Sequence, residues 1–288
     1  MLQKNSTPDH QVGASPAAIR AHYDLSDEFF QLVLGCDLIY SCALFDGVDD
    51  LAGAQLRKLD HHIEAAGAAG ARRVLDIGCG WGALLQRMVQ HADVKSAVGL
   101  TLSPSQANWI RRGSKPGIEV REESWRDHKP NQRYDAIISI GAFEHFVHLG
   151  MEPARKLEAY REFFDFCDRV LVSRGRLSLQ TIAYNQRPDN IDPFISEKIF
   201  PESELPLVWE PVAAAGKHFE LLALRNDREH YFRTLRLWDR NLAQKRDEAI
   251  ALVGEAAVED FRRYLRVSAA AFQSGIVCLL RMSFMKLY

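Results

Sequence analysis

Apolar runs and amphipathic stretches alternate along the chain from residue 72 to residue 182. Short runs rich in Val, Ile and Leu predict strands, and stretches with apolar residues at helical spacing predict helices between them. We expect strands at 73–77, 96–102, 118–122, 134–140 and 176–182, and helices at 83–90, 103–112 and 153–170. Strands that alternate with helices form a parallel sheet covered on both faces. The pattern predicts an α/β fold with a doubly wound, mostly parallel, Rossmann-like sheet.

The segments on either side of this alternation have other patterns. We expect residues 1–16 to be flexible and 17–34 and 51–66 to form N-terminal helices, the first interrupted at 22–26 and resumed with Ser26 as its N-cap. Residues 183–206 are rich in Pro and Asn, and long irregular insertions are often lids. We expect a lid or substrate-binding insertion at 183–215, with a helix at 207–215. A strand at 218–224, helices at 231–251 and 255–272 within a helical part at 230–272, and an antiparallel edge strand at 276–287 complete a single domain of residues 17–288.

The composition excludes several classes of protein. The 288 residues are 47% hydrophobic with a formal net charge of −2 at pH 7, which is typical of a globular protein and not of one that binds nucleic acid. The five cysteines form no Cys-x-x-Cys pair, so we expect no metal site and no disulfide framework. No apolar run reaches the length of about 18 residues that a transmembrane helix needs, and no signal peptide is recognised. We therefore expect a cytoplasmic protein whose contact with a membrane, if it has one, is peripheral.

Three glycines at alternate positions follow the first predicted strand. Gly78, Gly80 and Gly82 come after Asp76, and a predicted helix begins at residue 83. A glycine-rich turn between a strand and a helix makes a crevice where a ligand can lie against the main chain. The spacing also fits the Gly-x-Gly-x-x-Gly/Ala motif of dinucleotide sites, but those sites need an acid at the end of the second strand. The second strand ends near Thr101 without an acid, so the motif favours S-adenosyl-L-methionine.

A series of motifs runs in order along most of the chain and is more specific than the glycine turn alone. The motifs are 21–30 (AHYDLSDEFF), 40–42 (YSC), 75–82 (LDIGCGWG), 99–106 (GLTLSPSQ), 139–146 (SIGAFEHF), 199–201 (IFP), 230–231 (HY) and 237–238 (LW). With them the chain resembles the cyclopropane fatty acid synthase family, and especially its short members, the mycolic acid cyclopropane synthases and related methyltransferases. The resemblance implies a class I methyltransferase fold and an enzyme that uses S-adenosyl-L-methionine.

The resemblance also implies a set of residues around the cofactor. Thr101 and Gln106 would replace the missing acid at the ribose, because an amide can hydrogen-bond the hydroxyl groups. Trp125 would pack beside the adenine, and Tyr23 would cover the cofactor from the N-terminal segment. The full set is Tyr23, Tyr40, Ser41, Asp76, Gly78, Gly80, Gly82, Thr101, Leu102, Gln106, Trp125 and Ile140.

The chemistry that the resemblance implies is methyl transfer to an alkene carbon of a lipid or lipid-like substrate. Positive charge develops on the neighbouring carbon, and loss of a proton from the new methyl group closes a cyclopropane ring. The family holds bicarbonate as the base, with groups that correspond here to Cys42, Glu144, Gln180, Ile182 and Tyr231. Glu144 follows the strand 134–140, at the edge of the sheet where ligands bind. It could accept a hydrogen bond from bicarbonate, stabilise the cation, or act as the base itself.

One residue departs from the family pattern. Gln180 stands where the family usually has His, and a neutral amide can bind an anion but cannot relay a proton. Bicarbonate binding and a cyclopropane product are therefore both left open, with a methyl-branched alkene as the other product. The alternative function is methylation of a small secondary metabolite, an isoprenoid, an indole or an amine. Related plant N-methyltransferases commonly have an acid at the position of Gly141, which disfavours an amine. A non-catalytic binding protein is a third hypothesis, and the presence of Glu144 and Tyr231 argues against it.

The lid and a basic stretch bear on the identity of the substrate. Apolar side chains of the lid could line an acyl or isoprenoid tunnel or only pack the lid itself. They are Phe194, Ile195, Ile199, Phe200, Leu205 and Leu207. Basic residues between 233 and 266 could contact an anionic headgroup, a diphosphate or an acyl carrier protein, or form a solvated face, since acids are interleaved with them. The expected partner is a lipid-like alkene, free or carrier-bound.

Overall fold

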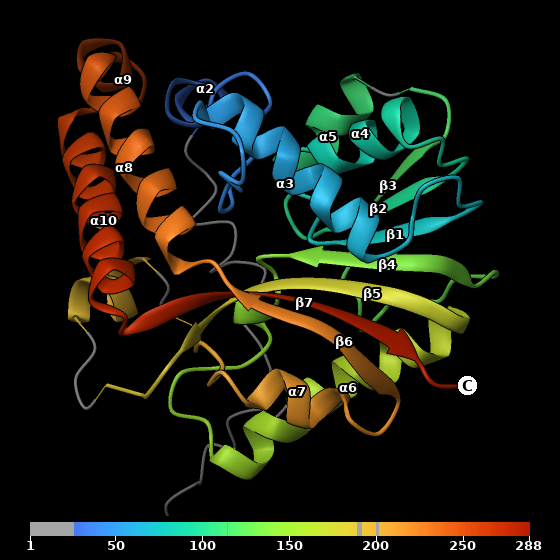
Figure 1. Ribbon diagram of the computed structural model, residues 1–288. Helices are drawn as coiled ribbons and strands as arrows, with labels where there is room; N and C mark the ends of the chain where they lie inside the picture. Colours follow the sequence, from blue (N-terminus) through green and yellow to red (C-terminus); the bar gives the residue numbers. More distant parts are fainter. Residues whose placement is uncertain (1–25, 114, 189–191, 200–201) are drawn as a thin grey trace, which may run out of the picture.

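The structure of the protein, a computed structural model, describes residues 26–113, 115–188, 192–199 and 202–288 and shows one twisted sheet between layers of helices (Figure 1). Within these residues the sheet has seven strands in the order β3-β2-β1-β4-β5-β7-β6. The strands are β1 (Val74–Ile77), β2 (Ala97–Thr101), β3 (Ile118–Glu122), β4 (Tyr134–Ile140), β5 (Leu171–Tyr184), β6 (Phe219–Asn226) and β7 (Val277–Lys286). Strands β1 to β5 run parallel, which confirms the predicted doubly wound, mostly parallel sheet.

The last strand, β7, lies inside the sheet and not at its edge. It pairs antiparallel with β5 on one side and with β6 on the other, so β6 is the edge strand. The antiparallel direction is confirmed, whereas the edge position predicted for residues 276–287 is wrong. Nearly every residue of β7 is buried, while most of β6 is exposed. Apolar side chains on both faces of a strand are typical of an interior position.

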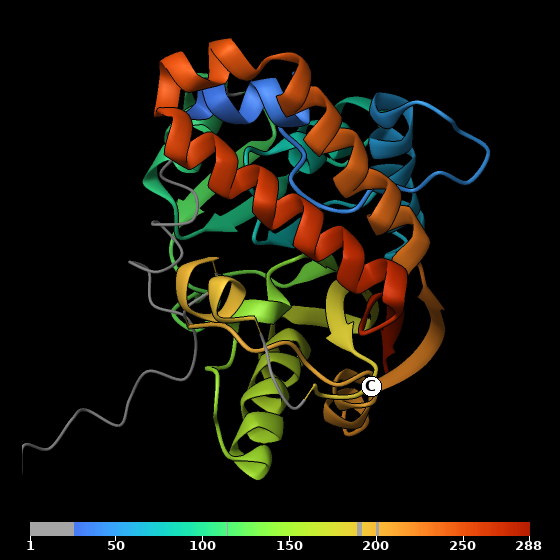
Figure 2. The same ribbon diagram turned by 90° about the vertical axis from the view of Figure 1, so that its left-hand side faces the viewer.

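Helices cover both faces of the sheet, and a helical layer stands beside it (Figures 1 and 2). Helices α3 (Leu51–Ala65), α4 (Ala83–His91) and α5 (Pro104–Arg112) lie on one face, and α6 (Pro153–Val170) and α7 (Glu210–Ala215) lie on the other. The layer beside the sheet consists of α2 (Asp27–Leu34), α8 (Arg228–Gln244), α9 (Arg246–Val253) and α10 (Glu255–Ser274). Figure 2 shows α8 and α10 side by side. A separate apolar cluster fills each of these three interfaces.

Several element boundaries differ from those predicted. The helix expected at 231–251 is two helices, which meet at Lys245 in a non-helical conformation (φ −114°, ψ 28°). Strand β5 begins at Leu171 and not at residue 176, and α7 begins at Glu210 and not at residue 207. The predicted N-cap is confirmed, because the N–H of Phe29 donates to Oγ of Ser26 at 3.1 Å.

Part of the sequence prediction falls outside the described residues. Residues 1–25, which include Tyr23, and residues 189–191 and 200–201 of the lid belong there. A flexible segment at 1–16, a single domain at 17–288 and a cytoplasmic location stay predictions. Among the described helices, none combines the length and the apolar character that crossing a bilayer requires.

Candidate active site

The glycine turn connects β1 to α4 at the carboxyl edge of the sheet. Gly78, Gly80 and Gly82 have φ angles of 83°, 53° and 85°, in the left-handed region that favours glycine. A Cβ atom on Gly80 would meet nothing within 4 Å, so the main chain faces open space there. A Cβ atom on Gly82 would lie 2.7 Å from Cγ1 of Ile110. Gly82 therefore serves the close packing of α4 against α5.

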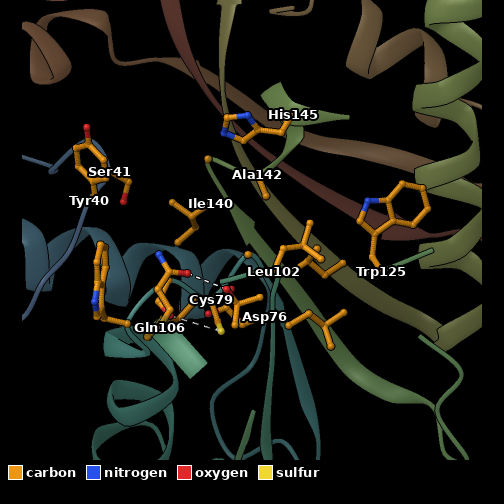
Figure 3. Close-up of a pocket in the computed structure, with 18 of the residues that line it drawn as sticks. Tyr40, Ser41, Asp76, Cys79, Leu102, Gln106, Trp125, Ile140, Ala142 and His145 are labelled. Carbon is orange, nitrogen blue, oxygen red and sulfur yellow. Dashed lines mark hydrogen bonds between the residues drawn. The ribbon is translucent and has the colours of Figure 1, made fainter. Parts of the chain in front are cut away.

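A first cavity, of about 590 Å³, opens at this turn (Figure 3). Tyr40 and Ser41 lie on one side of it and Trp125 on the other, with Asp76 and Gln106 between them (Figure 3). The predicted cofactor residues in its wall are Tyr40, Ser41, Asp76, Gly78, Gly80, Thr101, Leu102, Gln106, Trp125 and Ile140. Ligand pockets in proteins have volumes of about 300–1,000 Å³, so the first cavity has the size of a cofactor site.

Two predicted ribose-binding residues are joined to one another. Oγ1 of Thr101 donates to Oε1 of Gln106 at 2.7 Å, and it accepts a hydrogen bond from the N–H of Ser103 at 3.1 Å. With its oxygen engaged, Gln106 presents its amide nitrogen as a donor. Two acids at the end of β3, Glu122 and Glu123, also line the first cavity, and neither was expected from the sequence.

Lys58 lines the first cavity as well and was missed by the sequence prediction. Its side chain is buried on the inner side of α3, and its Nζ donates to Oγ of Ser41 at 2.7 Å. Lysine is rarely fully buried without a partner. A lysine among the buried positions Ala54, Leu59 and Ile63 of an amphipathic helix is the signal that could have identified it.

A second cavity, of about 490 Å³, shares Tyr40, Ser41, Gly141 and His145 with the first. The rest of its wall comes mainly from β5, the lid, α10 and β7. The apolar part includes Ile182, Ile195, Leu205, Phe272, Ile276 and Leu279. Ile195 and Leu205 of the lid therefore line the cavity, and Phe194, Ile199 and Leu207 do not. All five belong to the apolar cluster of the helical layer.

Glu144 lies on η1 (Phe143–His145), directly after β4, and lines the second cavity. Its Oε1 accepts a hydrogen bond from the N–H of Ile182 at 2.7 Å, while Oε2 is buried without a partner among the described residues. Burial raises the pKa of the carboxyl group from its ordinary value of 4.5 to about 7, and the hydrogen bond from Ile182 opposes this. An acid with such a pKa can exchange a proton near neutral pH, as a general base must.

Gln180, also in the wall of the second cavity, is held by two neighbours. Its Oε1 accepts a hydrogen bond from Nε of Arg281 at 2.9 Å and lies 3.3 Å from Nε2 of His62. Burial and the charge of Arg281 hold the pKa of His62 well below its ordinary value, so the imidazole is neutral. With the amide oxygen engaged, the amide nitrogen is the group that Gln180 offers to the cavity. Gln180 is therefore a hydrogen-bond donor here and has no basic atom that could take a proton.

The five groups implied for bicarbonate do not form one cradle. Those that line the second cavity are Glu144, Gln180, Ile182 and Tyr231. Cys42 does not line it, and its carbonyl oxygen accepts a hydrogen bond from Arg281 at 3.1 Å. The N–H of Ile182 is already donated to Glu144. Burial raises the pKa of the Cys42 thiol to about 11, which excludes a reactive thiolate. The described residues therefore do not fit bicarbonate in the way that the resemblance implies.

Comparison with known proteins places the chain among the cyclopropane synthases. The family profile of mycolic acid cyclopropane synthetase matches residues 10–282. The chain is 35% identical over 284 residues to cyclopropane mycolic acid synthase 1 of Mycobacterium tuberculosis, and the match covers 91% of this chain and 94% of that protein.

Solved structures lead to the same family. The cyclopropane synthase MmaA2 from Mycobacterium tuberculosis superposes with a TM-score of 0.86 at 32% identity, over 97% of this chain and 100% of that one. The mycolic acid cyclopropane synthase CmaA1, complexed with SAH and CTAB, superposes with a TM-score of 0.83 at 33% identity, over 96% and 99% of the two chains. A coclaurine N-methyltransferase, at 22% identity and a TM-score of 0.79, shares the fold. The chain belongs to the mycolic acid cyclopropane synthetase family.

Proposed function

We propose that this protein transfers a methyl or methylene group from S-adenosyl-L-methionine to an alkene carbon of a lipid-like substrate. It is an S-adenosyl-L-methionine-dependent enzyme of the cyclopropane synthase type. The observation that carries the proposal is the junction of the two cavities. A largely apolar cavity shares four wall residues with the cofactor cavity, and beside them lies the buried, unpartnered carboxyl oxygen of Glu144.

The groups around the first cavity fit S-adenosyl-L-methionine. The open main chain at Gly80 leaves room for close approach, and the indole of Trp125 offers an apolar face to the adenine. The amide nitrogen of Gln106 is a donor for a ribose hydroxyl group, and the carboxylate of Asp76 suits an ammonium group. When bound, this cofactor supplies an electrophilic methyl group that an alkene can attack.

We assign the proton transfer to Glu144. As the alkene π electrons form the new carbon–carbon bond, positive charge develops on the neighbouring substrate carbon, and an ionised carboxylate in apolar surroundings stabilises it. Oε2 then accepts a proton. If the proton comes from the new methyl group, its C–H electrons close a cyclopropane ring, and if it comes from an adjacent carbon, they form a double bond. We route no step through bicarbonate, because the groups present do not fit it.

The wall of the second cavity favours a lipid-like acceptor over an amine. Apolar side chains exclude water, which would otherwise capture the cation. Gly141, at the junction of the cavities, has no side chain that could bind an ammonium group, and a Cβ atom there would meet nothing within 4 Å. The site therefore lacks the extra acid expected for amine methylation at this position.

Delivery by an acyl carrier protein is a finer part of the proposal. Arg233, Arg236 and Arg240 line a surface groove along α8, and such proteins are acidic. Arg233 is already paired with Asp49 at 3.3 Å, but Arg236 and Arg240 are exposed. Replacing Arg236 and Arg240 by Ala should raise the KM for a carrier-bound acyl chain and leave that for the free acid unchanged. An unchanged KM for the carrier-bound acyl chain in this double variant would contradict delivery at this groove.

The experiment that tests the proposed function compares three acceptors. The purified protein is incubated with S-adenosyl-L-methionine and a mono-unsaturated lipid, its saturated counterpart, or an amine of similar size. We expect release of S-adenosylhomocysteine and a mass gain of one CH₂ group with the alkene alone. Turnover with the amine, or equal turnover with the saturated lipid, would refute alkene-directed transfer.

A further inference from the structure

Helix α3 turns three polar side chains toward the protein interior. Gln55, Lys58 and His62 are 4%, 1% and 0% exposed, respectively. Nε2 of Gln55 donates to the carbonyl oxygen of Ser41 at 2.9 Å, and Nζ of Lys58 donates to its hydroxyl oxygen at 2.7 Å. Two residues of α3 therefore fix Ser41, which stands in the wall between the two cavities.

Lys58 is a buried amino group without an acidic partner in the described part of the chain. Among the described residues it forms no ion pair within 4.0 Å, and neither does Asp76, the buried acid in the same cavity. Burial of an unpaired charge is costly, so such a group either becomes neutral or meets a partner of opposite charge. The first cavity thus holds an amino group from α3 and a carboxyl group from β1 that do not pair with one another, and burial brings the pKa of each to about 7.

We propose that Lys58, together with the hydroxyl group of Ser41, binds the carboxylate of the amino-acid part of the cofactor, while Asp76 binds its ammonium group. This inference rests on the proposed function, because it takes S-adenosyl-L-methionine as the occupant of the first cavity. The amino-acid part is a zwitterion, so its carboxylate can pair with Lys58 and its ammonium group with Asp76. The Lys58–Ser41 bond keeps the ammonium group of the lysine directed toward the bound carboxylate.

The charges around Lys58 add a pH dependence to this binding. Burial and the charge of Arg281 on β7 lower the pKa of Lys58 to about 7, against the opposing effects of Cys42 and of Asp76 on β1. A carboxylate that binds the ammonium group must raise this pKa again. At pH 8, where Lys58 is mostly neutral in the free protein, binding should therefore take up a proton. Burial also raises the pKa of Asp76 to about 7, so below pH 7 protonation of Asp76 weakens binding of the ammonium group. Above about pH 7 Asp76 is ionised, and the affinity should fall with rising pH as Lys58 loses its proton.

The test uses two ligands and two variants. S-adenosylhomocysteine and its analogue without the carboxylate are titrated calorimetrically into the wild-type protein, Lys58→Met and Arg57→Met. Arg57 is the neighbouring, more exposed basic residue of α3 and serves as the matched control. We expect Lys58→Met to weaken the binding of S-adenosylhomocysteine about 10- to 100-fold, the effect of one hydrogen bond to a charged group. It should leave the binding of the analogue nearly unchanged, and Arg57→Met should affect neither ligand.

Proton uptake in the wild-type protein is the second readout and needs no variant to fold. The heat of binding is measured at pH 8 in buffers of different ionisation enthalpy. The protein should take up a proton when it binds S-adenosylhomocysteine and should take up none when it binds the analogue. Equal weakening of both ligands by Lys58→Met, or equal proton uptake for both, would overturn the assignment to Lys58. If the wild-type protein bound neither ligand, the proposed function itself would fail.

Discussion

The substitution Glu144→Gln tests the catalytic role of the carboxyl group, because it replaces one carboxyl oxygen by an amide nitrogen and keeps the size of the side chain. The amide oxygen can still accept the hydrogen bond from the N–H of Ile182. The variant cannot take a proton from the substrate or stabilise a positive charge. We expect turnover to fall about 10²- to 10⁴-fold, the usual contribution of a general base. The affinity for S-adenosylhomocysteine should not change, because Glu144 does not line the first cavity.

The same substitution should stabilise the protein at alkaline pH. In the unfolded chain Glu144 ionises near 4.5, whereas burial raises its pKa in the folded protein to about 7. Between these values the unfolded chain releases a proton that the folded protein retains, so the folded state loses stability as the pH rises. The interval from 4.5 to about 7 corresponds to about 3 kcal/mol, at about 1.4 kcal/mol for each pH unit. Glu144→Gln should remove this cost, fully above pH 7 and hardly at all near pH 4.5.

Urea unfolding at pH 5 and pH 8 measures both parts of this effect. We expect Glu144→Gln to exceed the wild-type protein in free energy of unfolding by up to about 3 kcal/mol at pH 8 and by less than about 1 kcal/mol at pH 5. The exposed Glu158→Gln is the matched control and should stay within about 0.5 kcal/mol of wild type at both pH values. A variant with full turnover, or one with the same stability difference at both pH values, would refute a desolvated, catalytic carboxylate at this position.

Three further substitutions probe the surroundings of the site. Gln180→His should make the product ratio respond to added bicarbonate and shift it toward the cyclopropane, as seen by NMR of the lipid product; identical products with and without bicarbonate would contradict this. Arg281→Met should lower the free energy of unfolding by about 3–5 kcal/mol in urea, because it breaks the buried ion pair with Asp227, which keeps only Arg225, and removes the donor to the carbonyl oxygens of Cys42 and Ala43; a loss below about 1 kcal/mol would show that these contacts contribute little. Gly82→Ala should lower the free energy of unfolding in urea by about 1–3 kcal/mol, since φ is 85° and the new Cβ atom would lie 2.7 Å from Cγ1 of Ile110. Calorimetry should show little change in cofactor affinity for Gly82→Ala, and a large loss would mean that this glycine also contacts the ligand.

The parallel half of the fold was predictable because its signals are local. Strand β4 is mostly apolar, with Ala136, Ile137 and Ile138 in a row, and the N-cap Ser103 with Pro104 after it marks the start of α5. The antiparallel direction of β7 did not reveal its place in the sheet, because the order of strands depends on contacts between distant segments. Its apolar residues on both faces were a signal for the interior. The break at Lys245 has no proline or glycine to mark it.

The candidate site was predictable where it is carried by sequence motifs. The glycine turn, Tyr40 and Glu144 lie in motifs, and the structure brings them to the walls of two adjoining cavities. The orientation of Gln180 could not be predicted, because Arg281 reaches it from a strand 101 positions along the chain. Lys58 was missed because it belongs to no motif, although a lysine at a buried helical position was visible in the sequence.

The fate of a deuterium-labelled methyl group is the most direct test of alkene-directed methyl transfer at this site. The protein is incubated with S-adenosyl-L-methionine that carries a CD₃ group and with a mono-unsaturated lipid, and the product is analysed by mass spectrometry and NMR. We predict that the label is found on a former alkene carbon, as CD₂ in a cyclopropane ring or as CD₃ in a methyl branch, and that Glu144→Gln forms little of either product. A label on oxygen or nitrogen, or no transfer to the lipid, would contradict the proposed function.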